Sequence, residues 1–176
     1  MPTTPDLSSL CPALNADDFP TQYLPGTKEI PVDQVLVVLD DDQEGRTLHL
    51  QILPVPDIED LTVLQFYSQL PFSLNPANTA DLARFLHLVN QHLPLIGFAM
   101  NEDDATVYYR ALVPQPEGAA QLDIVVPTVW MTAYLLHRFA PLVEGVAIGE
   151  LAYEEGKAAL LEHLSRPYDP VSTGSS

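Results

Sequence analysis

The sequence is poor in basic residues and in cysteine. Its 176 residues include seven Lys and Arg against 24 Asp and Glu, which gives a formal net charge of −17. A surface so negative repels nucleic-acid phosphates and anionic lipid headgroups, so we expect no nucleic acid and no membrane among its partners. Cys11 is the single cysteine, so no disulfide can form within the chain, which fits a reducing compartment.

Targeting and membrane-spanning patterns are also missing. The first residues have neither the basic nor the apolar region of a secretory signal. The longest nearly apolar stretch, 124–136, contains Pro127 and ends before His137 and Arg138. A bilayer span needs about 20 apolar residues, so this stretch predicts a buried helix and the cytoplasm is the expected location.

Motifs of the common catalytic and phosphate-binding sites are absent as well. The sequence has no Ser-x-x-Lys, Gly-x-Ser-x-Gly, Walker or Gly-x-Gly-x-x-Gly pattern. Cys11 has no basic neighbour that would make it reactive, so we expect it to be inert. We therefore predict a non-enzymatic protein without a cofactor. The alternative is an enzyme or small-ligand binder with an acidic pocket that linear spacing does not reveal.

Prolines divide the chain into an arm, a domain and a tail. Five prolines fall within residues 1–30, where they disfavour long regular elements, so this arm is predicted to be irregular. It would lie over the domain through apolar side chains such as Leu10, Leu14 and Phe19. Residues 31–165 form the predicted single domain, and 166–176 a polar tail.

Alternating and β-branched runs predict strands in the first half of the domain. Residues 34–39 read QVLVVL, and in 46–53 leucine and isoleucine alternate with His49 and Gln51. With the turn at 40–45 they form a hairpin. Residues 61–70 fit a third strand better than the alternative short helix.

Helical periodicity appears further along. Asn75 and Pro76 predict a helix start, and the helix that follows has one apolar stripe. A second hairpin is expected from 95–101 and 105–113, and helices from 120–143 and 150–164. This order predicts an α+β fold: an antiparallel sheet of about five strands with helices packed mainly on one face.

Two sets of residues in the sequence are of the types that bind metal ions. Asp40, Asp42, Glu44 and Gly45 resemble the first half of a calcium loop, but position twelve is Gln51 and the flanks are strands, so a solvated hairpin turn is the better interpretation. His87 and His92 point about 140° apart on a helix and cannot chelate one metal together. No metal site is therefore predicted, and this acidic turn is kept as a weak candidate.

The helix predicted at 120–143 is apolar on every side. Either it is a central helix covered on two sides, or one of its faces is a subunit or client interface. Trp130, Tyr134 and Phe139 are the candidate interface anchors, since aromatic side chains often anchor such interfaces.

The stretch from 61 to 151, about half of the chain, resembles the YbjN-like group of small bacterial proteins, which share the fold of type III secretion chaperones. The segments that carry the resemblance are 82–90 (LARFLHLVN), 95–104 (LIGFAMNEDD) and 107–112 (VYYRAL), followed by the apolar helix with Trp130. The resemblance implies a homodimeric α+β domain that binds other proteins, and no catalytic residue. The proline-rich arm and the last helix depart from the pattern of the group.

These observations favour an acidic cytoplasmic protein that forms a homodimer and binds a protein client, in a chaperone-like or regulatory role. Its surface would suit an extended, basic or partly unfolded segment. A calcium-responsive protein built on the 40–45 turn is a third class of function.

Overall fold

The computed structural model describes residues 6–55, 61–116 and 119–166. Within these residues the chain forms six strands and four α-helices. The strands make one antiparallel sheet in the order β1-β2-β3-β4-β6-β5. They are β1 (Thr21–Leu24), β2 (Gln34–Asp41), β3 (Thr47–Pro54), β4 (Thr62–Ser73), β5 (Phe98–Asn101) and β6 (Thr106–Gln115). The helices are α1 (Leu10–Ala16), α2 (Thr79–Asn90), α3 (Leu122–Ile148) and α4 (Tyr153–Ser165).

The strand predictions are confirmed, and the central strands follow the alternation in the sequence. In β3, Leu48, Leu50 and Ile52 are buried, whereas His49 lies in solvent. The segment that could have been a short helix is the strand β4, which pairs with β3 on one side and β6 on the other. The predicted second hairpin is β5–β6, and β6 lies on the inside of that pair.

The prediction of an irregular N-terminal arm was wrong. Helix α1 buries Leu10 and Leu14, and strand β1 extends the sheet by pairing with β2. The prolines are compatible with this order because of their positions: Pro12 is in the first turn of α1, where its missing N–H has no intrahelical partner, and Pro20 precedes β1. The sheet consequently has six strands in the described residues instead of about five.

The start predicted for the first long helix is confirmed in detail. The side chain of Asn75 accepts a hydrogen bond from the Ala77 amide at 3.1 Å, and Pro76 follows at the first position of a 3₁₀ turn that leads into α2. The last residue of α2, Asn90, contacts the edge strand β5. Its side chain donates to the Phe98 carbonyl at 2.8 Å and accepts from the Phe98 amide at 3.1 Å.

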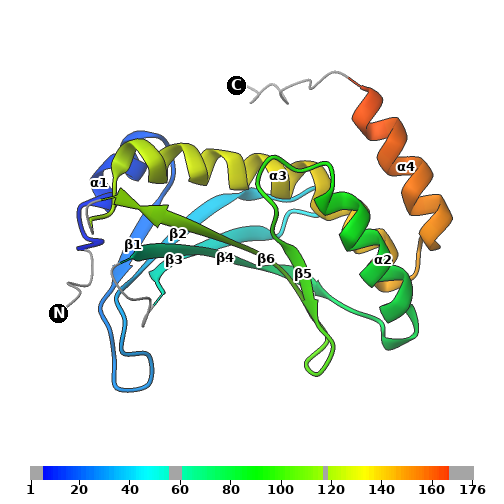
Figure 1. Ribbon diagram of the computed structural model, residues 1–176, viewed down its shortest axis with the longest axis horizontal. Coiled ribbons are helices and arrows are strands. Elements are labelled where there is room, and N and C mark those ends of the chain that lie inside the picture. Colours follow the sequence, from blue (N-terminus) through cyan, green and yellow to red (C-terminus); the bar gives the residue numbers. More distant parts are fainter. Residues whose placement is uncertain (1–5, 56–60, 117–118, 167–176) are drawn as a thin grey trace.

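Helix α3 crosses the whole sheet and is longer than predicted (Figure 1). It continues through Pro127 and Pro141 and ends at Gly149, whose φ of 88° favours glycine. Helix α1 packs against α3, and so do α2 and α4. Gly97, just before β5, allows the buried ring of Tyr109 to pack on the backbone, since a Cβ there would lie 2.7 Å from that ring.

The helices lie on one side of the sheet, as predicted (Figure 1). The architecture is therefore α+β with an open antiparallel sheet. In the described part of the chain, no helix combines the length and the apolar character that crossing a membrane requires. Helix α4 ends at Ser165, so apart from Arg166 the predicted polar tail lies outside the described residues.

Candidate functional site

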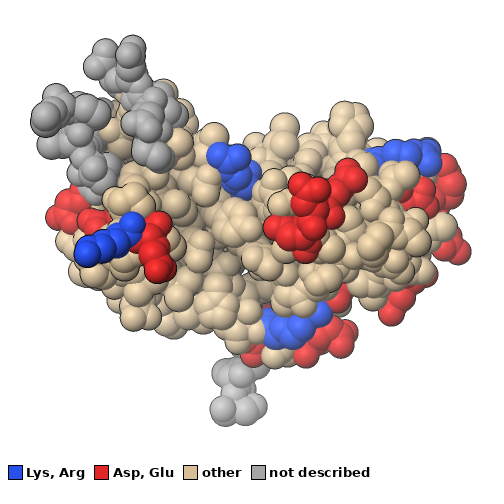
Figure 2. Space-filling model, turned by 90° about the horizontal axis from the view of Figure 1, so that it is seen from below, with Lys and Arg blue, Asp and Glu red and all other residues tan. Residues whose placement is uncertain are grey.

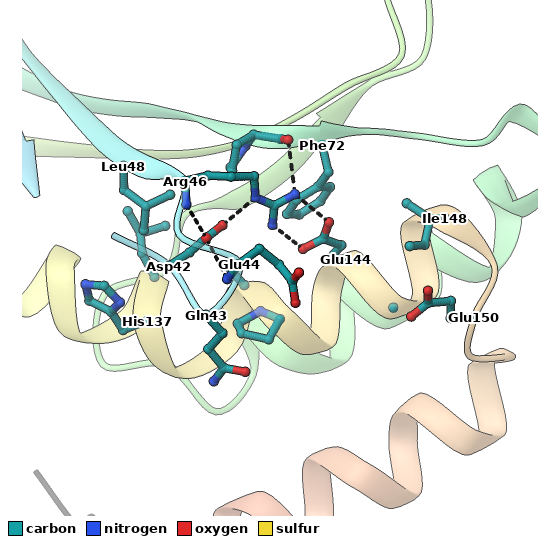
Figure 3. A pocket seen from close by; sticks show the side chains of 15 residues that line it. Asp42, Gln43, Glu44, Arg46, Leu48, Phe72, His137, Glu144, Ile148 and Glu150 are labelled. Atoms are coloured by element: carbon teal, nitrogen blue, oxygen red, sulfur yellow. Dashed lines mark hydrogen bonds and ion pairs between the residues drawn. The ribbon is translucent and has the colours of Figure 1, made fainter. Parts of the chain in front are cut away.

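A cavity of about 430 Å³ lies between the β2–β3 turn and α3 (Figure 3). The turn contributes Asp42, Glu44 and Arg46, and α3 contributes His137 and Glu144. Apolar walls come from side chains of β3, β4 and α3, including Leu48, Phe72 and Leu136. The cavity therefore combines carboxylates, one arginine and an apolar lining.

The Arg46 guanidinium joins the turn to α3. Its Nη1 and Nη2 donate to the two Glu144 oxygens at 2.8 and 2.6 Å, and its Nε donates to Asp42 Oδ2 at 2.7 Å. Nη1 also donates to the Pro71 carbonyl at 3.3 Å. The hydrogen bond to Glu144 raises the pKa of Arg46, partial burial lowers it, and the hydrogen bond to Asp42 raises it as well. Because the two carboxylates outweigh burial, the pKa of Arg46 lies above its ordinary value.

The hydrogen bonds of Asp42 explain why the acidic turn is structural. Asp42 Oδ1 accepts from the backbone amides of Glu44 and Arg46 at 2.9 and 2.8 Å. Partial burial raises the pKa of Asp42, but these amides and the Arg46 side chain outweigh it, so the pKa lies below its ordinary value. Both carboxylate oxygens are thus engaged within the turn. Among the described residues, no three His, Cys, Asp or Glu side chains are grouped so as to hold a metal ion.

The cavity thus contains several carboxylates, and its arginine is already paired with two of them. Figure 3 shows the Arg46 head group between Asp42 and Glu144, with His137 and Glu150 at opposite ends and away from it. We see no nucleophile–base pair among the labelled side chains, and the arrangement acts as a clamp between the turn and α3.

The second feature is the sheet face that carries no helix. Along each central strand, buried residues alternate with residues that point away from the helices. The cross-strand pairing places these outward residues side by side, so that they form rows across the sheet. One row runs through Leu36, Gln51, Tyr67 and Arg110, and the next through Leu53, Gln65 and Leu112. Of these seven residues only Arg110 is a Lys, Arg, Asp or Glu, and Figure 2 shows a broad face with few charged groups.

Tyr67 and Tyr108 are the aromatic residues of this open face. They lie diagonally across β4 and β6, and their ring centroids are 5.4 Å apart. Sequence reasoning did not pair them, because the pairing depends on the register of two strands separated by α2 and β5. The signal that could have found them is the polar–apolar alternation of β4 and β6, once those strands are placed side by side.

The three predicted interface anchors do not form one surface. The Trp130 side chain is 53% exposed, with its ring edge against Phe19 and its Nε1 donating to Asp17 at 3.3 Å. Tyr134 is half-buried and accepts from Arg138 at 2.7 Å. Phe139 belongs to the core and contacts the His163 ring, so its assignment as an interface anchor was wrong.

The histidines and the cysteine remain separate from each other. His87 bonds with Gln91 on α2, His49 lies in solvent on β3, and His163 packs on Phe139 at the end of α4. Cys11 is half-buried in α1. These four groups lie outside the cavity of Arg46 and the groove of the tyrosine pair, whereas His137 lines the cavity.

Comparison of the sequence with models of known protein families gave no match, and comparison with curated proteins gave none either.

Proposed function

We propose that the protein is a non-enzymatic, chaperone-like or regulatory binding protein that holds an extended segment of a client on the open face of its sheet. The observation that carries the proposal is that face: a broad antiparallel surface whose two central rows contain a single charged residue, Arg110, in a chain of net charge −17. Leu112 is exposed on it and Leu36 and Leu53 are half-buried, and apolar side chains gathered on one surface are typical of interaction sites. The resemblance to YbjN-like proteins, which implies protein binding, agrees with it.

Leu112 offers the most direct test. It lies on β6 with 47% of its side chain exposed, and Leu161 on α4 is a matched control with 51% exposed. Unstructured 12-residue peptides would be selected for binding from a displayed library, and their affinities measured by fluorescence anisotropy. Covering the exposed part of a leucine is worth about 1 kcal/mol, so Leu112→Gln should weaken binding about fivefold. Leu161→Gln should leave the affinity within about twofold, the difference expected for a surface residue outside the site.

Chemical-shift mapping of backbone amides gives an independent readout. Peptide binding should perturb β3, β4 and β6 and leave α4 unchanged. Selected peptides that perturb only the helical side, or a library that yields no binder, would refute the proposal.

We also propose that two copies pair through the outer face of α3. Trp130 and Tyr134 lie one turn apart on this face, Trp130 exposed and Tyr134 half-buried, and both residue types are enriched among interface anchors. In a symmetric pair the same patch of each copy meets its equivalent. Sedimentation velocity over a concentration series should show a dimer that Trp130→Ala weakens and Leu161→Ala does not. A monomer at all concentrations would exclude this pairing without affecting the open-face proposal.

A further inference from the structure

The open face is hollowed where it meets the β5–β6 turn. This groove, of about 740 Å³, has Tyr67 and Tyr108 of the strands and Glu102, Asp103 and Asp104 of the turn among its lining residues. Carboxylates and aromatic rings therefore face the same space. Either group alone attracts cations, and together they attract a cationic side chain that also has an apolar stem.

The tyrosine pair provides an aromatic wall. The two rings are tilted by 35°, with centroids 5.4 Å apart. The phenol of Tyr67 is neutral at pH 7, because the ordinary tyrosine pKa is about 10 and burial, followed by Tyr108 and Asp104, raises it further. The face of its ring carries the negative charge of the aromatic quadrupole. Tyrosines add contact area at low cost in side-chain entropy.

The β5–β6 turn, which carries Glu102, Asp103 and Asp104, is ordered, and two of its three carboxylates remain available to a ligand. The Asp104 carboxylate is held in place by two side chains. Its Oδ1 accepts from the Thr106 hydroxyl at 2.6 Å, and its Oδ2 accepts from the side-chain amide of Asn101 at 2.9 Å. Glu102 and Asp103 are exposed, and within the described residues neither carboxylate takes part in an ion pair or side-chain hydrogen bond. Their negative charge is available to a ligand.

Arg110 also lines the groove, and its side-chain hydrogen bond is made to β4 and not to the turn. Arg110 Nε donates to Gln65 Oε1 at 2.6 Å, which holds the side chain toward β4. No ion pair links Arg110 to the turn in the residues described. The chain therefore leaves an acidic rim beside its aromatic pair, although Arg110 lies on β6, the strand that also carries Tyr108.

We propose that the groove formed by Tyr67, Tyr108 and the Glu102–Asp104 turn binds a lysine or arginine side chain of the extended client segment. The cationic head lies between the tyrosine faces and the carboxylates, and the flanking aliphatic residues of the segment lie on the open face. This inference rests on the proposed function, since it names what the open face selects in a client.

A second copy of the chain fits the groove less well. Two chains of charge −17 would bring like-charged turns together, and like charges at an interface oppose docking. Addition of a strand at the neighbouring edge is also hindered, because the Asn90 side chain already bonds the amide and carbonyl of Phe98. A basic segment lying across the face avoids both obstacles.

The test uses the full chain and three fluorescein-labelled 12-residue peptides. All contain the same leucines in a Ser/Thr background, and the two central positions are lysine, Nε-acetyl-lysine or glutamate. In 50 mM NaCl the lysine peptide should bind at least about fivefold more tightly than the acetylated one, the preference expected from one cation–π contact and a partly screened ion pair. The preference should shrink at 0.5 M NaCl, and the glutamate peptide should bind most weakly.

Variants assign the preference to the groove. The double change Glu102→Gln and Asp103→Asn should remove most of the preference for lysine, and Tyr108→Leu should reduce it while the acetylated peptide keeps its affinity. The matched control is Glu154→Gln with Glu162→Gln, which alters the net charge equally on α4. It should leave the preference unchanged.

The outcomes separate the two proposals. If the lysine and acetyl-lysine peptides bind equally and Leu112→Gln weakens both, the open face binds clients and the cation site is wrong. If the two double variants have equal effects, the preference reflects net charge alone and the groove is again wrong. If no peptide binds, the groove has no such ligand, and the displayed-library selection decides the proposed function separately.

Discussion

Replacing Arg46 by methionine removes the cation that joins the β2–β3 turn to α3, and its cost can be bounded from the geometry. The Arg46 side chain is 32% exposed, while Glu144 and Asp42 are 20% and 12% exposed. Fully exposed ion pairs contribute about 0.2–1 kcal/mol, and loss of one partner from a fully buried pair costs about 3–5 kcal/mol. The cluster lies between these limits.

We expect Arg46→Met to lower the free energy of unfolding by about 2 kcal/mol. Three charge-assisted hydrogen bonds are lost, and Asp42 and Glu144 are left near each other without the cation. Methionine keeps much of the apolar stem, so the loss reports mainly on the charge. In a chain of this length the change corresponds to about 4–8 °C in melting temperature.

The assay is a double-mutant cycle by urea unfolding at pH 7, with Arg46→Met, Glu144→Gln and the double variant. The coupling energy should be about 1–1.5 kcal/mol, the range for neighbouring groups that share a hydrogen-bonded ion pair. Half or more of it should persist in 0.5 M NaCl, because partly buried pairs are screened less than exposed ones. A coupling near zero, or an Arg46→Met variant as stable as the wild type, would refute the clamp.

Three further predictions concern other contacts. Trp130→Ala should cost about 1–2 kcal/mol in a monomeric sample, less than the roughly 3–5 kcal/mol of a buried aromatic, because about half the ring is already in solvent; a larger loss in urea unfolding would place it in the core. Asn90→Ala should speed hydrogen exchange of the Phe98 amide and destabilise by about 1–3 kcal/mol, since that amide and carbonyl lose their partner; unchanged exchange would contradict this. Burial, then Arg138 and Arg166, lower the pKa of His163, so the folded state resists a proton that the unfolded chain accepts. Stability of the wild type relative to His163→Gln should therefore fall as the pH drops from 6.5 toward the lowered pKa, and a constant difference in unfolding free energy between pH 7.5 and 5 would argue against it.

The helices and strands could be predicted because in most segments the apolar residues recur at one clear spacing, either every second residue or every three to four. Alternation marks β3, and apolar spacings of three and four mark α2. The prediction for residues 1–30 was wrong for a physical reason. A proline opposes regular structure inside a helix or strand, but it is tolerated at the start of one. Pro12 and Pro20 both lie at such starts, and counting prolines without locating those starts predicts the wrong outcome.

The sites were harder to predict, with one instructive exception. Tyr67 and Tyr108, and likewise Arg46 and Glu144, are brought together by register and by packing across the chain, which local sequence does not specify. The separation of Phe139 from Trp130 could have been predicted. Nine helical residues at about 100° each place the two side chains on opposite faces of α3, so one of them had to be in the core.

The long helix α3 also determines when the sheet becomes protected during synthesis. All six strands precede it in the chain, and it supplies much of the apolar cover of their buried face. A nascent chain therefore exposes a row of β-branched and leucine side chains until the segment from 122 onward has left the ribosome. During that interval the same side chains that later form the core are free to pair with other nascent chains. The folding yield of this protein in a cell should therefore depend on how quickly the C-terminal third of the chain is translated.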